Sequence, residues 1–241
     1  MISHEEIPNY MMAMTMPFKV KDTTLFVGVS VGDSVQGTLA VSRSESWLET
    51  LSVIGKGEPP KEMPAEDIRI ARLFQKGKPL PDLEFRNQDN RPVRFSSFKG
   101  KVVAVTFIYT RCPLPDFCIR MSDYFARIQR TLKKDASLAE KWHLVSISFD
   151  TKHDSPVVLK KYGKNYGADF TRWDFLTGNE DAIMKITDGF DMFIQNERGG
   201  IFNHNLRTAI LDKNGKLVET IISNEWKPEE VAEKMRELSK K

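Results

Sequence analysis

The chain has 241 residues, of which 40% are hydrophobic and 29% charged, and its net charge at pH 7 is +3. This composition is typical of a folded protein of one or two domains and excludes disordered and fibrous proteins. No apolar run reaches the roughly 18 residues that a membrane-spanning helix needs. The small net charge, without a basic stripe interleaved with aromatic residues, indicates no nucleic-acid partner.

The first 55 residues are expected to form short strands and no long helix. The predicted strands cover residues 1–3, 14–21, 34–42 and 47–54, with turns at 32–33 and 42–46. Closely spaced strands favour a small all-β barrel or sandwich. Glycine and proline are then frequent between residues 55 and 82, which is typical of a linker, and a short helix is expected inside it at 65–74.

From residue 83 onward, predicted strands and helices alternate. Strands are expected at 83–86, 92–95, 102–109, 144–149, 207–212 and 216–222, and helices at 119–134, 155–166, 180–189 and from 228 onward. This order predicts an α/β thioredoxin-like fold, a central sheet flanked by helices with an N-terminal β-hairpin extension. The predicted organisation is therefore a small β-barrel at 1–56, a linker at 57–79 and a thioredoxin-like domain at 80–241.

The only two cysteines, Cys112 and Cys118, lie on the loop between the predicted strand 102–109 and the helix 119–134. Open α/β sheets present their sites at this carboxyl edge. A helix N-terminus lowers the pKa of a nearby thiol and favours the thiolate, the form that attacks disulfides and binds metals. Buried structural thiols or a simple structural disulfide are the alternative, but the strand-to-helix junction favours a functional site.

A metal site needs a third ligand, and His204 is the best candidate because it precedes the predicted strand 207–212, opposite the cysteine loop. Two thiolates and one imidazole suit three-coordinate Cu(I) and also accept Cu(II). Asp150, at the end of the neighbouring strand, is a candidate oxygen ligand. His143 and His153 are expected to be ordinary surface histidines.

Three runs, FIYTRCPLPDFC, SISFDTKHDSP and FNHNLRTAILDKNGKLV, resemble the Sco/SenC family. Its members are thioredoxin-fold proteins that bind copper and help assemble the CuA centre of cytochrome c oxidase, and some are thiol–disulfide reductases. The resemblance covers about residues 78–241 and implies that Cys112, Cys118 and His204 are copper ligands, with Asp150 beside the site. The usual family spacing is C-x3-C, whereas this loop is C-x5-C, a form that one branch of the family resembles.

Four of the ten methionines fall within six residues, at Met11, Met12, Met14 and Met16. Met14 and Met16 have strand spacing, so both side chains are expected on one face. Thioethers are soft, neutral ligands that bind Cu(I) or Ag(I) without losing a proton. The alternative is that these methionines fill a core, although a core strand more often uses Val, Ile or Leu.

The run ISHEEIPNYMMAMTMPFKV resembles the CusF-type periplasmic copper and silver chaperones, which are five-stranded barrels of OB type. This resemblance implies that His4, Met14 and Met16 bind Cu(I). Met11 stands where the family has a tryptophan, so a third thioether would replace the cation–π contact of that ring. Trp47 lies far along the chain and is not assigned to the metal.

A barrel of this kind needs a strand before Ile2, and no basic segment followed by an apolar core marks an export signal. The chain is therefore expected to be a truncated form of a longer precursor, located in the periplasm or anchored to a membrane and facing the periplasm. The barrel edge left open by the missing strand invites self-association.

Three functions compete. The first is a copper metallochaperone whose acceptor is the cytochrome c oxidase subunit carrying CuA or another copper-accepting protein. The second is a thiol–disulfide oxidoreductase using Cys112 and Cys118, and the third is a copper or silver resistance buffer. A dithiol reductase needs neither His204 nor the methionine cluster, so both features favour metal handling.

Overall fold

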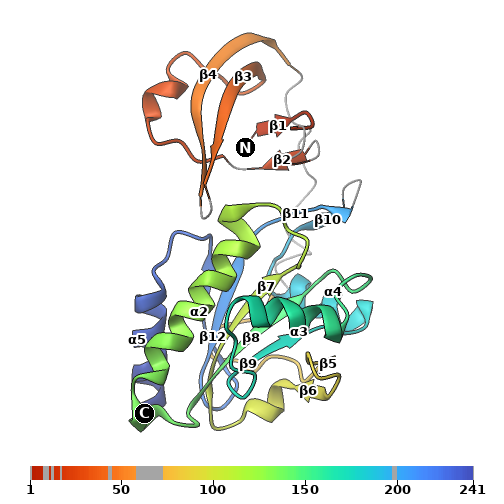
Figure 1. The fold of residues 1–241 in the computed structure, drawn as a ribbon, viewed down its shortest axis with the longest axis vertical. Coiled ribbons are helices and arrows are strands. Elements are labelled where there is room, and N and C mark those ends of the chain that lie inside the picture. Colours follow the sequence, from red (N-terminus) through yellow and green to blue (C-terminus); the bar gives the residue numbers. More distant parts are fainter. Residues whose placement is uncertain are drawn as a thin grey trace.

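A five-stranded sheet forms the centre of the C-terminal part of the protein, in the strand order β13-β12-β7-β8-β9 (Figure 1). The computed structural model describes residues 2–7, 11, 14–16, 18–42, 45–57, 73–196 and 200–240. The strands of this sheet are β7 (Val102–Ile108), β8 (Trp142–Ser148), β9 (Trp173–Leu176), β12 (Arg207–Leu211) and β13 (Leu217–Ile222). β7, β8 and β9 run parallel, whereas β12 and β13 are antiparallel to their neighbours.

The two central strands are buried along their whole length. Every residue of β7 and β8 is buried, and the two strands pair in register from Val102 and Trp142 to Ile108 and Ser148. Parallel strands covered on both faces have nearly continuous apolar sequences rather than alternating ones. The run VVAVTFI in β7 has this character and is the reason that strand was predictable.

Among the described residues, four helices flank the sheet: α2 (Arg120–Lys133), α3 (Pro156–Asn165), α4 (Glu180–Gly189) and α5 (Pro228–Lys240). α2 and α5 lie side by side, and α5 contacts β7 (Figure 1). α2 buries Met121, Phe125, Ile128 and Leu132, which recur at the spacing of one helix face. The expected thioredoxin-like α/β fold is confirmed.

The hairpin extension is also present. β5 (Glu84–Arg86) and β6 (Pro92–Arg94) pair antiparallel, and Arg86 forms a bridge with Thr177 just beyond β9. This bridge attaches the hairpin to the edge of the central sheet.

The described residues of the N-terminal part form strands and one short 3-10 turn at Thr23–Phe26, in agreement with the expected small β domain. β1 (Ile2–His4) pairs with β2 (Met14–Met16), and β3 (Asp33–Val41) pairs with β4 (Ser46–Lys56). An isolated bridge joins Val20 to Leu48. The strand expected at 14–21 is shorter than predicted, because β2 ends at Met16 and beyond it the chain forms only the bridge at Val20.

Three strands were not predicted: β9 and the hairpin of β10 (Ile194–Asn196) and β11 (Phe202–His204). Each is only three or four residues long and lacks a readable alternation. The helix expected at 65–74 lies almost wholly outside the described residues. Within the described part of the chain, no helix has the length and apolar character to span a bilayer.

Candidate metal centre

The loop that carries the cysteines is held to the neighbouring strand at its start. The amide N–H of Thr110 donates to Asp154 at 2.9 Å, and its hydroxyl donates to the same carboxylate at 2.5 Å. Ser148, at the end of β8, also donates to Asp154 at 2.5 Å. Because Asp154 is fully buried, these bonds fix where the loop leaves the sheet.

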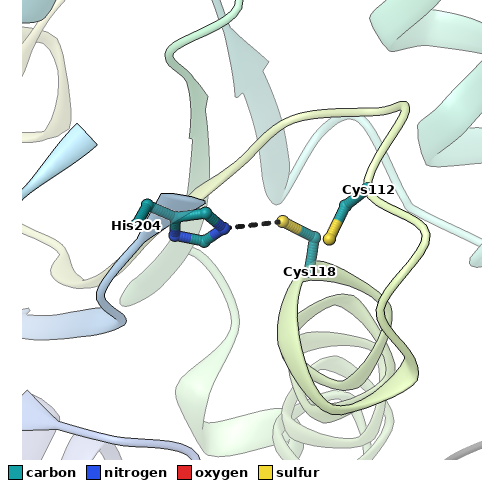
Figure 2. Close-up of side chains that lie close together, drawn as sticks. All are labelled: Cys112, Cys118 and His204. Carbon is teal, nitrogen blue, oxygen red and sulfur yellow. Dashed lines mark hydrogen bonds between the residues drawn. The ribbon is translucent and has the colours of Figure 1, made fainter. Parts of the chain in front are cut away.

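Cys112, Cys118 and His204 come together although they belong to three different elements (Figure 2). Cys112 lies on the loop after β7, Cys118 in a π-helical turn (Pro115–Ile119) that leads into α2, and His204 on β11. Their sulfur atoms and a ring nitrogen lie within 4.8 Å of one another, and all three residues are buried. Cys118 Sγ is 3.9 Å from His204 Nε2.

The imidazole of His204 is oriented by its own neighbour in sequence. Its Nδ1 lies 2.9 Å from the carbonyl oxygen of Asn205, which can only accept, so Nδ1 carries the proton. Nε2 then presents its lone pair toward Cys118. A hydrogen bond from the far ring nitrogen is the usual way in which proteins orient a metal-binding histidine.

Aromatic rings enclose this imidazole. Its centroid lies 5.7 Å from that of Tyr109, 5.4 Å from that of Phe117 and 5.0 Å from that of Phe149. The rings keep water away from Nε2 and lower the local dielectric constant, so a charge placed among these donors interacts strongly with them.

The two thiols are not equivalent. Burial by itself raises the pKa of Cys112, but hydrogen bonding, chiefly from Cys118, outweighs it and brings that pKa well below its usual range, with His204 adding to the effect. Burial raises the pKa of Cys118 well above its usual range, and the neighbouring Cys112 adds to the effect. The low-pKa thiol is therefore Cys112, and the backbone N–H of Cys118, in the helical turn that leads into α2, is among the groups that lower its pKa.

This donor set fits a soft monovalent metal. Two sulfurs and one imidazole nitrogen, all buried and converging, suit Cu(I) at low coordination number. The Nε2 lone pair of His204 is already directed at the sulfurs, and one thiol is already disposed to ionise. Metal binding needs both cysteines deprotonated.

The other candidates lie outside this cluster. The carboxylate of Asp150 accepts two hydrogen bonds from Arg111, at 3.1 Å from Nε and 2.6 Å from Nη2. His153 is exposed, as expected, and contacts Asp154. The prediction for His143 was wrong: its exposed fraction is 4%, and its Nε2 lies 2.9 Å from Asp174, because β8 is covered on both faces.

A cavity of about 430 Å³ opens beside the cluster. Phe149 and Phe202 line it, and Phe149 is one of the rings that contact His204. Arg111, the residue before Cys112, lines the same cavity. One aromatic layer therefore separates His204 from this cavity.

In the N-terminal part, His4 has the same arrangement as His204. Its Nδ1 lies 2.5 Å from the carbonyl oxygen of Glu5, so Nδ1 carries the proton. Its Nε2 is buried and has no hydrogen-bond partner among the described residues. The β1–β2 register places Met14 opposite His4 and Met16 opposite Ile2. A buried, unpartnered nitrogen is unusual enough to require an explanation, and a metal ion would supply one.

Two further N-terminal residues have defined places. Met11 is buried, with an exposed fraction of 3%, and its backbone pairs with that of Ile7. Trp47 is covered by Lys21, whose Nζ lies 3.3 Å from the ring centroid.

Two important carboxylates were not identified from the sequence. Asp154 fixes the start of the cysteine loop, and Asp116 lies inside that loop, buried, where it accepts hydrogen bonds from Ser46 of β4. An acidic residue in the otherwise apolar run PLPDFC was the available indication for Asp116.

Comparison with known proteins gives a family match for the N-terminal part and another for the C-terminal part. The profile of the SCO1/SenC family matches residues 75–240, which is more than half of the chain. The chain belongs to the SCO1/SenC family. Residues 1–52 match a second family, described as the copper binding periplasmic protein CusF.

Individual relatives agree with this assignment. The SCO1 protein homolog of Bacillus subtilis is 37% identical over 122 residues, covering 46% of this chain and 61% of the relative. A SCO2-like protein of Rickettsia felis is 30% identical over 146 residues, covering 57% of this chain and 66% of the relative. The chain thus spans just under two thirds of the length of these relatives.

Solved structures confirm the Sco-type fold. A SCO1/SenC family lipoprotein from Bacillus anthracis is similar with a TM-score of 0.61 at 27% identity, covering 69% of this chain and 99% of that one. The copper-bound ScoI of Bradyrhizobium japonicum is similar in fold, with a TM-score of 0.56 at 22% identity, covering 68% and 99%.

Proposed function

We propose that this SCO1/SenC protein is a periplasmic copper metallochaperone that binds Cu(I) or Cu(II) through Cys112, Cys118 and His204. The observation that carries the proposal is the convergence of three buried soft donors, with His204 Nε2 held toward Cys118 by the bond from Nδ1 to Asn205. A structural pair of thiols would not need an imidazole oriented in this way.

The proposal includes a second site in the N-terminal part, formed by His4, Met14 and Met16, with Met11 as a further candidate thioether. The buried, unpartnered Nε2 of His4 and its register with Met14 support it. Thioether and imidazole donors accept Ag(I) as readily as Cu(I), so Ag(I) is the more convenient probe because it does not oxidise.

Copper stoichiometry of the reduced protein tests both sites. We expect two Cu(I) ions per chain in the wild type and one in Cys112→Ser, Cys118→Ser or His204→Ala. Met14→Leu is expected to lose the other ion with little loss of stability, since the two side chains have similar volumes. His153→Ala is the matched control, because His153 is an exposed histidine outside the cluster. Full retention of copper in His204→Ala would refute the three-ligand site.

We further propose that the acceptor is the CuA-bearing subunit of cytochrome c oxidase. Family membership supports this role, and the cavity beside His204 offers a partner an approach to the site. Mixing the Cu(I)-loaded protein with the apo CuA domain should transfer copper to that domain, and one-electron oxidation by added ferricyanide should then develop the CuA absorption. A buffer that only sequesters metal would retain its copper in this assay.

A second candidate, thiol–disulfide exchange by Cys112 and Cys118, is favoured by one observation. The pKa of Cys112 is lowered by its hydrogen bonds while that of Cys118 is raised, and such a division suits an attacking and a resolving thiol. His204→Ala separates the two functions. Reduction of a disulfide in the CuA domain at the wild-type rate, together with lost copper binding, would favour the reductase.

A further inference from the structure

The N-terminal part of the protein, within residues 2–57, is attached directly to the loop that carries the cysteines. Asp116, between Cys112 and Cys118, has an exposed fraction of only 5%. Its Oδ2 accepts two hydrogen bonds from Ser46, from the amide at 2.6 Å and from the hydroxyl at 2.7 Å. Lys19 Nζ lies 3.8 Å from the other carboxylate oxygen. Ser46 and Lys19 both belong to the N-terminal part.

The C-terminal part of the protein holds Asp116 in position for this contact. Arg120, one helical turn further on, forms a buried ion pair with Asp116 and also reaches Glu45 at 3.4 Å. Asn224 donates to the backbone carbonyl of Asp116 at 2.5 Å. Figure 1 shows the β3–β4 ribbon reaching toward the N-terminal end of α2. A polar contact with these partners is specific in geometry as well as in charge.

A second contact brings the two candidate metal sites together. β2, the strand that contains Met14 and Met16, lies against β11, the strand that ends at His204, with Cα atoms within 8 Å (Figure 1). β1, which ends at His4, is the direct neighbour of β2. Each proposed site therefore has a ligand-bearing strand at the same interface between the N-terminal and C-terminal parts.

We propose that Cu(I) passes directly from the His4–Met14–Met16 site to the Cys112–Cys118–His204 site within one chain, and that the contact of Ser46 with Asp116 holds the two sites together for this transfer. The inference rests on the proposed function. It also gives the longer C-x5-C loop a role, because this loop contains Asp116, whose carboxylate binds the N-terminal part.

The transfer exchanges ligands without a change of oxidation state. Bonds from Cu(I) to the imidazole of His4 and to the thioethers break, while bonds to Cys112, Cys118 and His204 Nε2 form. Copper remains Cu(I), and the protons still held by the two thiols are released to water. Thiolates are charged and thioethers are neutral, so the cysteine site is the stronger one and determines the direction of transfer.

The experiment begins with the oxidised 241-residue chain, in which a Cys112–Cys118 disulfide leaves only the N-terminal site available to Cu(I). One equivalent of Cu(I) is bound, a phosphine then reduces the disulfide, and the ultraviolet thiolate-to-copper absorption reports arrival at the cysteines. For wild type we expect a first-order rise whose rate constant does not depend on protein concentration and is unaffected by a Cu(I) chelator in solution.

Ser46→Glu tests the contact, because it places a second carboxylate against Asp116. We expect the concentration-independent rate to fall at least tenfold, with unchanged copper stoichiometry at equilibrium. Ser52→Glu is the matched control, since Ser52 lies on the same strand β4 but is exposed, and its side chain bonds to Gln36 within that ribbon. It should transfer copper as the wild type does.

Three results would overturn the inference: a wild-type rate proportional to protein concentration, complete interception by the chelator, or an unchanged rate in Ser46→Glu. Equilibrium stoichiometry distinguishes this failure from failure of the proposed function. If Cys112→Ser and Met14→Leu each lose one ion but transfer is intermolecular, only the direct transfer is wrong. If either variant keeps both ions, the proposed sites fail and the transfer fails with them.

Discussion

The two histidines proposed as ligands are oriented by the same local device. In His4 and in His204, Nδ1 bonds to the backbone carbonyl oxygen of the next residue, which leaves Nε2 unprotonated and inward. A carbonyl oxygen accepts but never donates, so each imidazole is kept in the tautomer that a metal ligand requires. A side-chain partner could change its own protonation with pH, whereas a backbone carbonyl cannot.

Alkylation kinetics should reveal the inequality of the two thiols. Because hydrogen bonding from Cys118 lowers the pKa of Cys112, and His204 adds to the effect, that thiol stays ionised below the usual value of about 8.5. We expect iodoacetamide to modify Cys112 first, with a rate midpoint below that value. His204→Ala should move the midpoint upward, since it removes an imidazole that contributes to the lowered pKa. Peptide mapping at several pH values measures both; faster modification of Cys118 would contradict the assignment.

Some site residues could be predicted from residue type and position, and others could not. Cys112, Cys118 and His204 are rare residue types at the ends of predicted strands, so the topology brings them together. The roles of Asp116 and Asp154 depend on partners 70 and 44 positions away in the sequence. Carboxylates are common on surfaces, and apart from the apolar neighbours of Asp116 nothing local distinguishes these two from solvated ones.

At the level of elements, length and periodicity decided what could be predicted. β7 and α2 have seven and fourteen residues, with a continuous apolar run and a clear helical face. β10 and β11 have three residues each, too few for any period to appear. His204 was therefore expected in a loop, although the side of the sheet on which it lies was inferred correctly.

Gly200 in the connection between β10 and β11 supports Arg111 beside the cysteines. Its φ is +75°, and a Cβ there would lie 2.4 Å from Arg111 Nη1. We expect Gly200→Ala to lower the free energy of unfolding by about 1–3 kcal/mol, because alanine is strained at this positive φ, and to weaken copper binding, because the guanidinium of Arg111, the residue before Cys112, must move aside.

Gly215→Ala is the matched control for that substitution. Gly215 has φ of +74° and nothing within 4 Å of the Cβ position, so it has the same backbone cost without the clash. Urea unfolding and competition with a Cu(I) chelator measure the two effects. Equal behaviour of the two variants would show that the contact with Arg111 is unimportant.

An ion pair links the end of α2 to the approach to β9 and should make stability depend on pH. Hydrogen bonds from Lys133 and Thr171 lower the pKa of Asp169 from 3.8 to about 2. Because the folded-state pKa is the lower one, the stabilisation is present above pH 3.8 and is lost as pH falls toward 2. With allowance for solvent screening, it is about 1 kcal/mol.

Asp169→Asn should therefore cost about 1 kcal/mol in the free energy of unfolding at pH 7 and almost nothing at pH 2. Glu237→Gln removes the same charge from an exposed position on α5 and should have little effect at either pH. Denaturant titrations at the two pH values provide the comparison. A loss of equal size at pH 2 would mean that the charge of Asp169 is not its source.

In the molecule as a whole, the sequence indicated an N-terminal and a C-terminal part with soft-metal ligands but not how the two parts meet. Composition separates a β-rich start from an α/β remainder, and each part has its own cluster of sulfur and imidazole donors. The contact of Ser46 with Asp116 and the approach of β2 to β11 are tertiary facts between distant segments. Neither has a sequence pattern, because an interface between two folded parts has no period along the chain.

Metal binding should be visible in the stability of the whole protein. A ligand that binds only the folded state stabilises it by about 2.7 kcal/mol at a free concentration 100 times its Kd. For a chain of this size, each kcal/mol raises Tm by roughly 2–4 °C. Anaerobic Cu(I) should therefore raise Tm by about 5–10 °C, and a strong chelator should reverse the shift.

The variants assign that shift to its site. The double variant Cys112→Ser, Cys118→Ser should lose the larger part of the gain, because the stronger site is removed, and Met14→Leu should lose the smaller part. Calorimetry of each variant with and without Cu(I) gives both contributions, and apo Tm values close to that of the wild type show that the substitutions leave the fold intact. A gain that persists undiminished in the double cysteine variant would place the stabilising copper elsewhere in the protein.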